Sequence, residues 1–422
     1  MTLFTTSRAP SWQTWLPLLA VFALPFGRSV ELFVLIMAMI GIYDLITDHS
    51  HIRSSKGFKL FSLFFLCFWI PALLSLPDAV NLNHSAANVF GMLRFYFAGL
   101  FIVNRIADYK SHLWLAAGIG LVMVFWSLDG WVQLIFGYDL FGIPPFSNDR
   151  ISGVFGSNPK LGLMIIPFFA VAIVALKQKI GIYLGLIMAL LIISIVLLGG
   201  NRAAWVSLIT ITILWVTLFR PKNFVLSRRS LIAIFVGISL MAIAVINTAQ
   251  FQTRLNLSLI AFKGGYAAIN DASADRLSVW TTALRVFEAH PVNGVGARGF
   301  RYAYPDYANK DDLWVNFSLP REQQTGQTHA HQILLEFMTD TGCIGLIGYF
   351  IALGILFIKW RPIARSQSNQ IGTAYLISLM AVLFPINTHL SFFSSNWGQV
   401  IWFLVALTIS ALMMDTANSV EK

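Results

Sequence analysis

Long apolar runs recur along this chain, and they limit its fold more than any other feature. Twelve such runs approach or reach the roughly 20 residues that a helix needs to cross a bilayer. Strands of a membrane barrel are excluded, because such strands are about 10 residues long and alternate apolar with polar positions. The sequence therefore predicts an all-α polytopic membrane protein with about 12 transmembrane helices. The runs cover residues 12–27, 30–47, 60–76, 89–104, 113–136, 161–176, 181–198, 203–219, 231–248, 332–358, 371–390 and 397–414.

The composition points to the same class. Hydrophobic residues make up 57 % of the 422 residues and charged residues only 11 %, with a mean hydropathy of +0.71. A soluble protein carries roughly 25 % charged residues, so a soluble globular enzyme and a disordered chain are both excluded. The net charge of +10 would suggest nucleic acid in a soluble protein. In a membrane protein the side on which the charges lie matters more, and we expect the lipid bilayer, not nucleic acid, as a partner.

The basic residues predict the orientation. If the N-terminus is cytoplasmic, the segments on the inside hold sixteen basic residues and the short outer loops hold four. Short inner loops of membrane proteins carry an excess of Lys and Arg, so both termini are expected in the cytoplasm. The inside set is Arg8, Arg53, Lys56, Lys59, Arg105, Lys110, Lys177, Lys179, Arg220, Lys222, Arg228, Arg229, Lys359, Arg361, Arg365 and Lys422, and the outside set is Arg28, Arg150, Lys160 and Arg202.

One outer loop is much longer than the rest and divides the chain into three parts. Residues 1–248 hold helices one to nine, residues 249–330 form the loop, and residues 331–422 hold helices ten to twelve. Loops of this length in compact proteins are usually functional. Within it, Asp275–His290 is predicted to be an amphipathic helix, because steps of 3, 4 and 3 place its large apolar residues on one face. Those residues are Leu277, Trp280, Leu284 and Phe287.

Two histidines mark the point where this loop enters the tenth helix. His329 and His331 precede Gln332, and an imidazole with a pKa near 6.5 is well suited to accept a proton at neutral pH. From spacing alone, two interfacial histidines without a chemical role are an equal alternative. Cys67 and Cys343 are the only cysteines and both lie in apolar runs. No metal-ligand spacing is seen, and neither a metal nor another cofactor is expected.

Several cations are predicted on the same outer face. Two glycines and Asn201 precede Arg202 at the start of a helix, an arrangement that favours an anion, although an arginine that only anchors the helix end is the alternative. Arg276 and Arg285 lie nine residues apart, so one helix presents them on opposite faces. Further candidates are Arg150 and Lys160 in the second outer loop (residues 137–160) and Arg298 in the long loop.

Together these residues predict a site at the outer leaflet for an anionic, lipid-linked compound and a polar reactant that arrives from outside. A secondary transporter is a remote alternative. Transporters often have repeated halves and ionisable groups near the midplane, whereas here the long loop follows nine of twelve helices. Arg94 is a basic residue inside a predicted span, where charge usually faces a cavity or a partner. The sequence leaves that partner open.

Four blocks between about residues 150 and 350 resemble the O-antigen ligase and polymerase superfamily. Twelve spans with a large outer loop after the ninth are similar to its ligase branch. The blocks are Asp275-Arg276, Trp280, Ala283-Leu284, Phe287, His290 to Gly296 and Phe300; Ala330-His331-Gln332, Leu335-Glu336, Thr341-Gly342 and Gly345; Asn201-Arg202-Ala203; and Arg150, Gly153 and Asn158-Pro159.

The resemblance implies a metal-independent glycosyltransferase of the GT-C type in the bacterial inner membrane. Such an enzyme transfers a glycan from undecaprenyl diphosphate to the lipid A–core oligosaccharide at the periplasmic face, in lipopolysaccharide biosynthesis. By the same resemblance His331 is the catalytic base, and Arg202 and Arg276 bind the diphosphate. An O-antigen polymerase and a protein O-oligosaccharyltransferase remain open, because both need the same site. Further candidates for the site are Arg150, Lys160, Arg298, His329 and Gln332.

Overall fold

The computed structural model describes residues 12–147, 150–218, 228–260, 264–273, 275–365, 369–388 and 390–420. Within these ranges every regular element is a helix, and the β-contacts are limited to one isolated bridge between Ser147 and Arg150. The predicted all-α class is confirmed. Both chain ends, with Arg8 and Lys422, and the loop cations Arg220 and Lys222 lie outside the described residues. The cytoplasmic placement of the termini therefore stays a prediction.

Each of the twelve predicted apolar runs coincides with helical structure, and short helices join some of them. In the first half these are α1 (Trp12–Phe22), α2 (Ser29–Thr47), α3 (His49–Ser54), α4 (Lys56–Leu74), α5 (Leu82–Gly91), α6 (Leu93–Arg105), α7 (Tyr109–Phe136), η1 (Gly153–Phe155), α8 (Leu161–Ile180), α9 (Ile182–Leu198) and α10 (Arg202–Leu218). The second half holds α11 (Arg228–Ile246), α12 (Ala249–Leu259), α13 (Tyr266–Ser273), α14 (Arg276–Ala289), α15 (Phe300–Tyr307), η3 (Arg321–Gln323), α16 (Ile333–Arg365), α17 (Gln370–Val382) and α18 (Ser395–Val420).

These helices make the chain a multi-pass membrane protein. By length and apolarity, the described residues hold seven helices that can cross a membrane, or up to eight if the bent pair Phe235–Ile246 and Ala249–Leu259 is one span. Shorter apolar helices lie at Ile182–Leu198, Arg202–Thr217 and Gln370–Val382. The figure of twelve spans stays a prediction.

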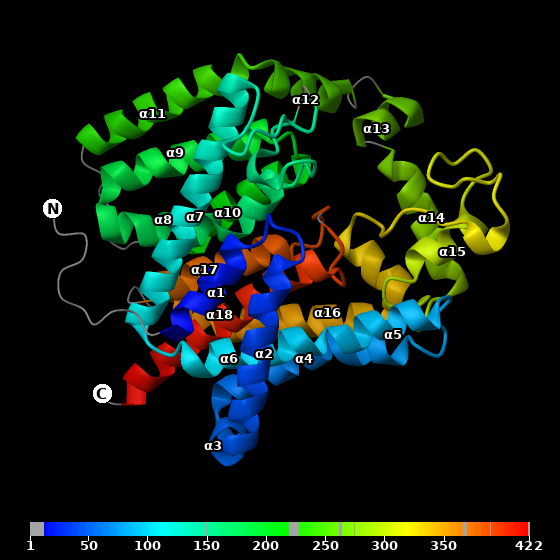
Figure 1. Ribbon diagram of the computed structural model, residues 1–422, viewed down its shortest axis with the longest axis horizontal. Coiled ribbons are helices and arrows are strands. Elements are labelled where there is room, and N and C mark those ends of the chain that lie inside the picture. The colour runs from blue at the N-terminus through cyan, green and yellow to red at the C-terminus, as the bar shows by residue number, and fades with distance from the viewer. Residues whose placement is uncertain are drawn as a thin grey trace.

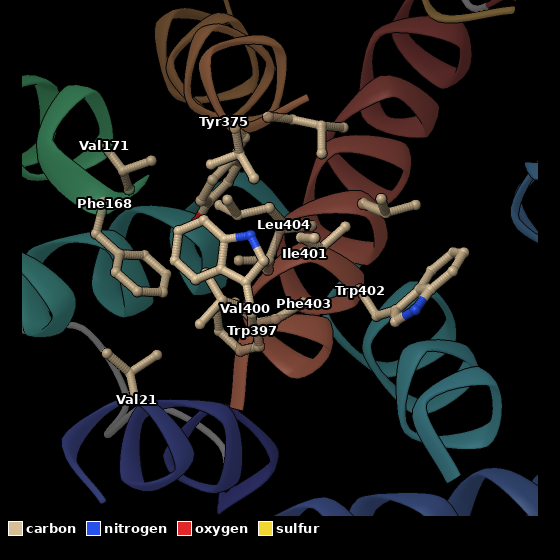
Figure 2. Packing of buried hydrophobic residues seen from close by; sticks show 14 of the residues in the cluster. Val21, Phe168, Val171, Tyr375, Trp397, Val400, Ile401, Trp402, Phe403 and Leu404 are labelled. Atoms are coloured by element: carbon tan, nitrogen blue, oxygen red, sulfur yellow. The ribbon is translucent and has the colours of Figure 1, made fainter. Parts of the chain in front are cut away.

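The core of the helix bundle lies around α8, α17 and α18. Figure 2 shows Trp397 and Phe403 of α18 on the side of Phe168 of α8, with Tyr375 of α17 nearby, whereas Trp402 points the other way. By contrast, α2 exposes a row of large apolar side chains, among them Leu32, Met39, Tyr43 and Ile46. A helix that is apolar on every side is typical of a membrane span, and the exposed row of α2 is therefore suited to lipid.

Two arginines inside the bundle are paired with acids of α2. Arg94, whose partner the sequence left open, donates from Nε to Glu31 Oε2 on α2 at 2.9 Å and from Nη2 to Ser395 Oγ on α18 at 2.9 Å. Arg105 pairs in the same way with Asp44 of α2. Both pairs join α2 to α6. The predicted span at residues 89–104 lies within Leu82–Arg105, the spanning helix that α5 and α6 form together.

The long outer loop is structured and has a core of its own. Helix α14 confirms the predicted amphipathic helix, but the predicted packing face is wrong. Its buried side chains are Val279, Thr282, Ala283 and Val286, whereas Leu284 is 44 % exposed. The side chains that fit against the rest of the loop core are therefore the ones that are buried. The loop core consists of Val279, Ala283, Val286, Val295, Phe300, Ala303, Tyr304, Val315 and Ala330.

The loop is fastened to the bundle at a break in α16. Gly342 has a φ of 62° there, in a conformation that favours glycine. The turn after α14 supplies the missing backbone partners: Val295 N–H donates to Thr339 O at 2.8 Å, and Cys343 N–H donates to Pro291 O at 2.8 Å. A Cβ on Gly294 would lie 2.4 Å from Thr339 O, so only glycine allows this approach. Figure 1 shows α14 and α15 beside the end of α16.

Candidate functional site

The short turn between the loop and α16 carries His331 in a constrained conformation. His331 has a φ of 52°, in the left-handed region that non-glycine residues rarely adopt. The indole N–H of Trp280 on α14 donates to Ala330 O at 3.1 Å and fixes the turn from one side. Gln332 fixes it from the other, because its Oε1 accepts from Leu335 N–H at 2.7 Å and its Nε2 donates to Pro385 O. Both ends of the Gln332 amide are thus occupied by backbone groups, so Gln332 positions the turn.

The His331 ring is partly buried next to a second imidazole. Its centroid lies 3.9 Å from that of His329, and its Nε2 is 3.4 Å from Gln327 Oε1. Burial and the positive charge of Arg276 lower the pKa of His331 from 6.5 to about 4. The ring is therefore neutral at pH 7 and able to accept a proton, as a general base must be.

Arg276 lies within electrostatic range of two arginines from separate elements, and we call Arg150, Arg202 and Arg276 the arginine cluster. Burial, with the charges of Arg202 and Arg150, lowers the pKa of Arg276 to about 10. The guanidinium stays charged at pH 7 at this value. Among the described residues, no carboxylate pairs with Arg276. Three guanidinium groups held together in this way favour an anion with several oxygens, such as a diphosphate.

Local sequence explains the positions of two members of the cluster. Gly200 has a φ of 64°, which lets the chain turn directly into α10 at Arg202, and Asn201 O accepts the first helical bond from Ala204 N–H at 3.0 Å. Arg276 opens α14 in the same manner, after Asp275 with a φ of 58°. The predicted helix start at Arg202 is confirmed.

Buried polar side chains at one end of α7 organise the loop that carries Arg150. Gln133 Oε1 accepts from Ser152 N–H and Gly153 N–H, each at 2.9 Å. Asp129 Oδ1 accepts from Leu140 N–H at 2.9 Å, and Asp139 Oδ1 accepts from Ile143 N–H at 2.7 Å. The sequence analysis did not single out these residues, although acids and amides inside an apolar helix were the signal that could have found them.

A polar cavity of about 380 Å³ adjoins the histidine pair and gathers three further candidates, Lys160, Arg298 and His329. Burial lowers the pKa of Lys160, and none of the described residues that line the cavity is acidic. A negatively charged or hydroxyl-rich group suits this lining. The remaining lining residues are His84, Asn88, Thr328, Leu390, Ser391, Ser394, Ser395 and Asn396.

Two buried acids beneath the cavity hold Arg298 and the start of α18. Arg298 has a φ of 60°, and its backbone N–H donates to Asp340 Oδ2 at 2.8 Å. Glu336 accepts from the Ser391 hydroxyl and from Phe392 N–H. These two hydrogen bonds occupy both carboxylate oxygens of Glu336.

Other sequence candidates lie elsewhere. Arg285, predicted to face away from Arg276, donates to Tyr307 O at 3.0 Å and to Asn309 Oδ1 at 2.8 Å. Among the described residues, no three His, Cys, Asp or Glu side chains gather as metal ligands. The candidate site comprises His331, the arginine cluster and the polar cavity.

Comparison with known proteins finds a match over part of the chain. No curated protein matches the chain. Residues 186–350, which contain Arg202, Arg276 and His331, match the family model described as O-Antigen ligase.

Proposed function

We propose that this protein is a metal-independent glycosyltransferase of the GT-C type that ligates O-antigen glycan to lipid A–core oligosaccharide. The donor is a glycan on undecaprenyl diphosphate, and the reaction takes place at the periplasmic face of the bacterial inner membrane. The observation that carries this proposal is the meeting of a neutral His331 with the arginine cluster beside a polar cavity. A base and an anion-binding group are the two parts that such a transfer needs.

The acceptor hydroxyl attacks the anomeric carbon of the donor glycan. The new bond forms between that carbon and the hydroxyl oxygen, and the bond from the carbon to the diphosphate oxygen breaks. His331 takes the proton of the hydroxyl, a role that typically contributes about 10²–10⁴-fold to the rate. The leaving diphosphate carries away the bonding electrons, and the arginine cluster stabilises the charge that develops on it.

The positioning of the two reactants contributes further to the rate acceleration of the proposed transfer. The site lies between the outer loop and the bundle, so a lipid-linked donor can reach it from the membrane while a sugar acceptor enters from the aqueous side. Holding both reactants in line converts a bimolecular step into a nearly unimolecular one. The polar cavity beside His329 is suited to the acceptor, because its hydroxyl, amide and basic groups match a sugar.

Substitution of His331 tests the proposal in the producing cell. With His331→Ala we expect long glycan to accumulate on the carrier lipid and to be absent from the core, with normal protein levels in the membrane. The control is His290→Ala, since His290 bonds Tyr307 and lies outside the proposed site. Attachment of single repeats to the core in the His331 variant would show a polymerase instead. Unchanged glycolipids would refute the role of His331.

A further inference from the structure

The outer loop has a second cavity, lined by residues that the proposed reaction does not use. It measures about 570 Å³ and lies in the segment that follows α15. Figure 1 shows this segment as the yellow loop at the edge of the molecule, beyond α14 and α15. Its lining residues are Asp312, Leu313, Trp314, Val315, Asn316, Leu319, Gln323 and Thr325.

The cavity is built on a rigid base. Tyr304 is fully buried, and its hydroxyl donates to Asp312 Oδ2 at 2.9 Å, while Asp312 Oδ1 accepts from Trp314 N–H at 2.9 Å. Both carboxylate oxygens are therefore occupied. Gln324 Nε2 donates to Leu319 O at 2.7 Å and closes the far side of the segment. A shape fixed in advance loses little entropy when a ligand binds.

The free groups in the cavity match a sugar ring. The side chain of Trp314 is 40 % exposed and offers an apolar indole face and one N–H donor. Among the described residues, no group bonds the side chains of Gln323 or Thr325, so an amide and a hydroxyl remain available. A pyranose has C–H groups on its faces and hydroxyls around its edge, and it pairs with an aromatic ring and amides in this way.

The alternative occupants fit less well. None of these eight described lining residues is basic, which disfavours a phosphate. A lipid surface would suit Leu313, which is 82 % exposed, and Phe317, which is 38 % exposed. However, the amides in the hollow would then lose water without gaining partners. The segment also lies on the side of α15 away from the bundle (Figure 1).

The chain connects this cavity to the reacting centre. Five residues separate Thr325 from His331, so the two Cα atoms lie at most about 20 Å apart. Within this segment, Gly326 N–H donates to Arg301 O at 2.9 Å, and Gln327 Oε1 lies 3.4 Å from His331 Nε2. A ligand in the cavity is thus held a few sugar units at most from the bond that forms.

We propose that this cavity binds a neutral saccharide unit of one of the two reactants, remote from the reacting carbon. This inference rests on the proposed function. It assigns Trp314 and Gln323 as residues that recognise the glycan and not as catalytic residues.

Binding without turnover tests the inference independently of the chemistry. The full-length His331→Ala protein is mixed with lipid-free oligosaccharide, either from the cell's own O-antigen or from its core, and contacts are detected by saturation-transfer nuclear magnetic resonance. We expect contacts with one of the two, which identifies the source. Adding Trp314→Ala should weaken that affinity by about tenfold, the scale of one aromatic contact. The matched control is Leu284→Ala, which removes an exposed side chain of α14 outside the cavity.

In the active protein, Trp314→Ala should raise the KM of the same reactant about 3- to 10-fold with kcat unchanged, because uniform binding is lost. Equal affinity in both variants, or no binding of either oligosaccharide, would overturn the inference. So would quenching of Trp314 emission by brominated phospholipid, measured against Trp314→Phe, since that result would place the segment in the membrane. Turnover that survives His331→Ala would refute the proposed base and leave the binding result intact.

Discussion

Two groups of arginines in this protein differ in what surrounds them. Arg94 and Arg105 each meet a carboxylate on α2, so their charge is compensated inside the bundle. Arg276 instead lies beside Arg202 and Arg150, and no carboxylate among the described residues pairs with it. Buried charge without a counter-charge is expensive. We expect the first group to hold helices together, whereas the proposed function assigns Arg276 to an anionic substrate.

Removal of Arg276 is expected to have the largest effect on activity. Arg276→Ala should lower kcat/KM by about 10²–10³, the scale found when one group that stabilises a developing negative charge is removed. The melting temperature should not fall, because repulsion within the arginine cluster is relieved. Turnover of lipid-linked donor by purified protein and thermal unfolding of the same sample measure the two quantities.

Arg276→Lys is the matched control for charge. It should recover only part of the activity, because an ammonium lacks the planar fork that binds two phosphate oxygens at once. If Arg276→Ala unfolds the protein while Arg276→Lys is fully active, Arg276 acts as a structural charge and the contrast with Arg94 fails.

For Arg94 we expect the opposite result, a loss of stability without a loss of specific activity. Arg94→Ala leaves Glu31 without its partner. For a fully buried pair this lowers the free energy of unfolding by about 3 kcal/mol. The loss should be smaller for the pair of Arg94 and Glu31, because both side chains are partly exposed. The double variant Arg94→Ala with Glu31→Ala should recover part of that loss. Thermal unfolding of the wild type, the two single variants and the double variant measures the coupling energy between the two residues. If the losses of stability are additive, the pair contributes nothing to stability.

Sequence reasoning predicted the helices well because apolar runs of spanning length leave few alternatives. It also singled out His331 and Arg202, whose roles stay predictions, since a histidine pair at a helix entry and a cation after two glycines are local signals. It did not find the packing face of α14, because Val279 and Ala283 are buried through their fit against the outer-loop core and not through their size.

The long-range partners were beyond local patterns for a physical reason. Glu31 and Arg94 lie 63 residues apart, and Glu336 and Ser391 lie 55 apart. Only the folded chain brings them together. The break at Gly342 is a further case, since its backbone partners come from the turn after α14.

The pH dependence of His331 should report the charge of its surroundings. Arg276 and burial both lower the pKa of His331. Arg276→Gln removes one of these causes, so the pKa should rise from about 4 toward the ordinary 6.5 without reaching it. Titration of ring-labelled histidine by nuclear magnetic resonance measures the shift without requiring activity. An unchanged pKa would contradict the coupling between the two residues.

The same reasoning predicts how a bound donor changes the base. A diphosphate on the arginine cluster cancels positive charge near His331, which favours the protonated ring and raises its pKa. The acidic limb of kcat should therefore lie at higher pH than that of kcat/KM, which reports the free enzyme. Coincident limbs would indicate that the diphosphate binds away from Arg276.

The smallest expected effect concerns Gln133, which acts on the site only through the loop that carries Arg150. Gln133→Leu removes the acceptor of Ser152 N–H and Gly153 N–H, and two buried donors are left without a partner. Loosening of this loop should raise the donor KM by about 3- to 10-fold, because a cation held less firmly contributes less to binding. Arg150→Ala should raise it by at least as much. The double variant should then be no worse than Arg150→Ala alone, since a positioning residue has no effect once its target is gone. If the increases in KM add up in the double variant, Gln133 supports the fold in general. In that case Gln133 does not act on the site through Arg150.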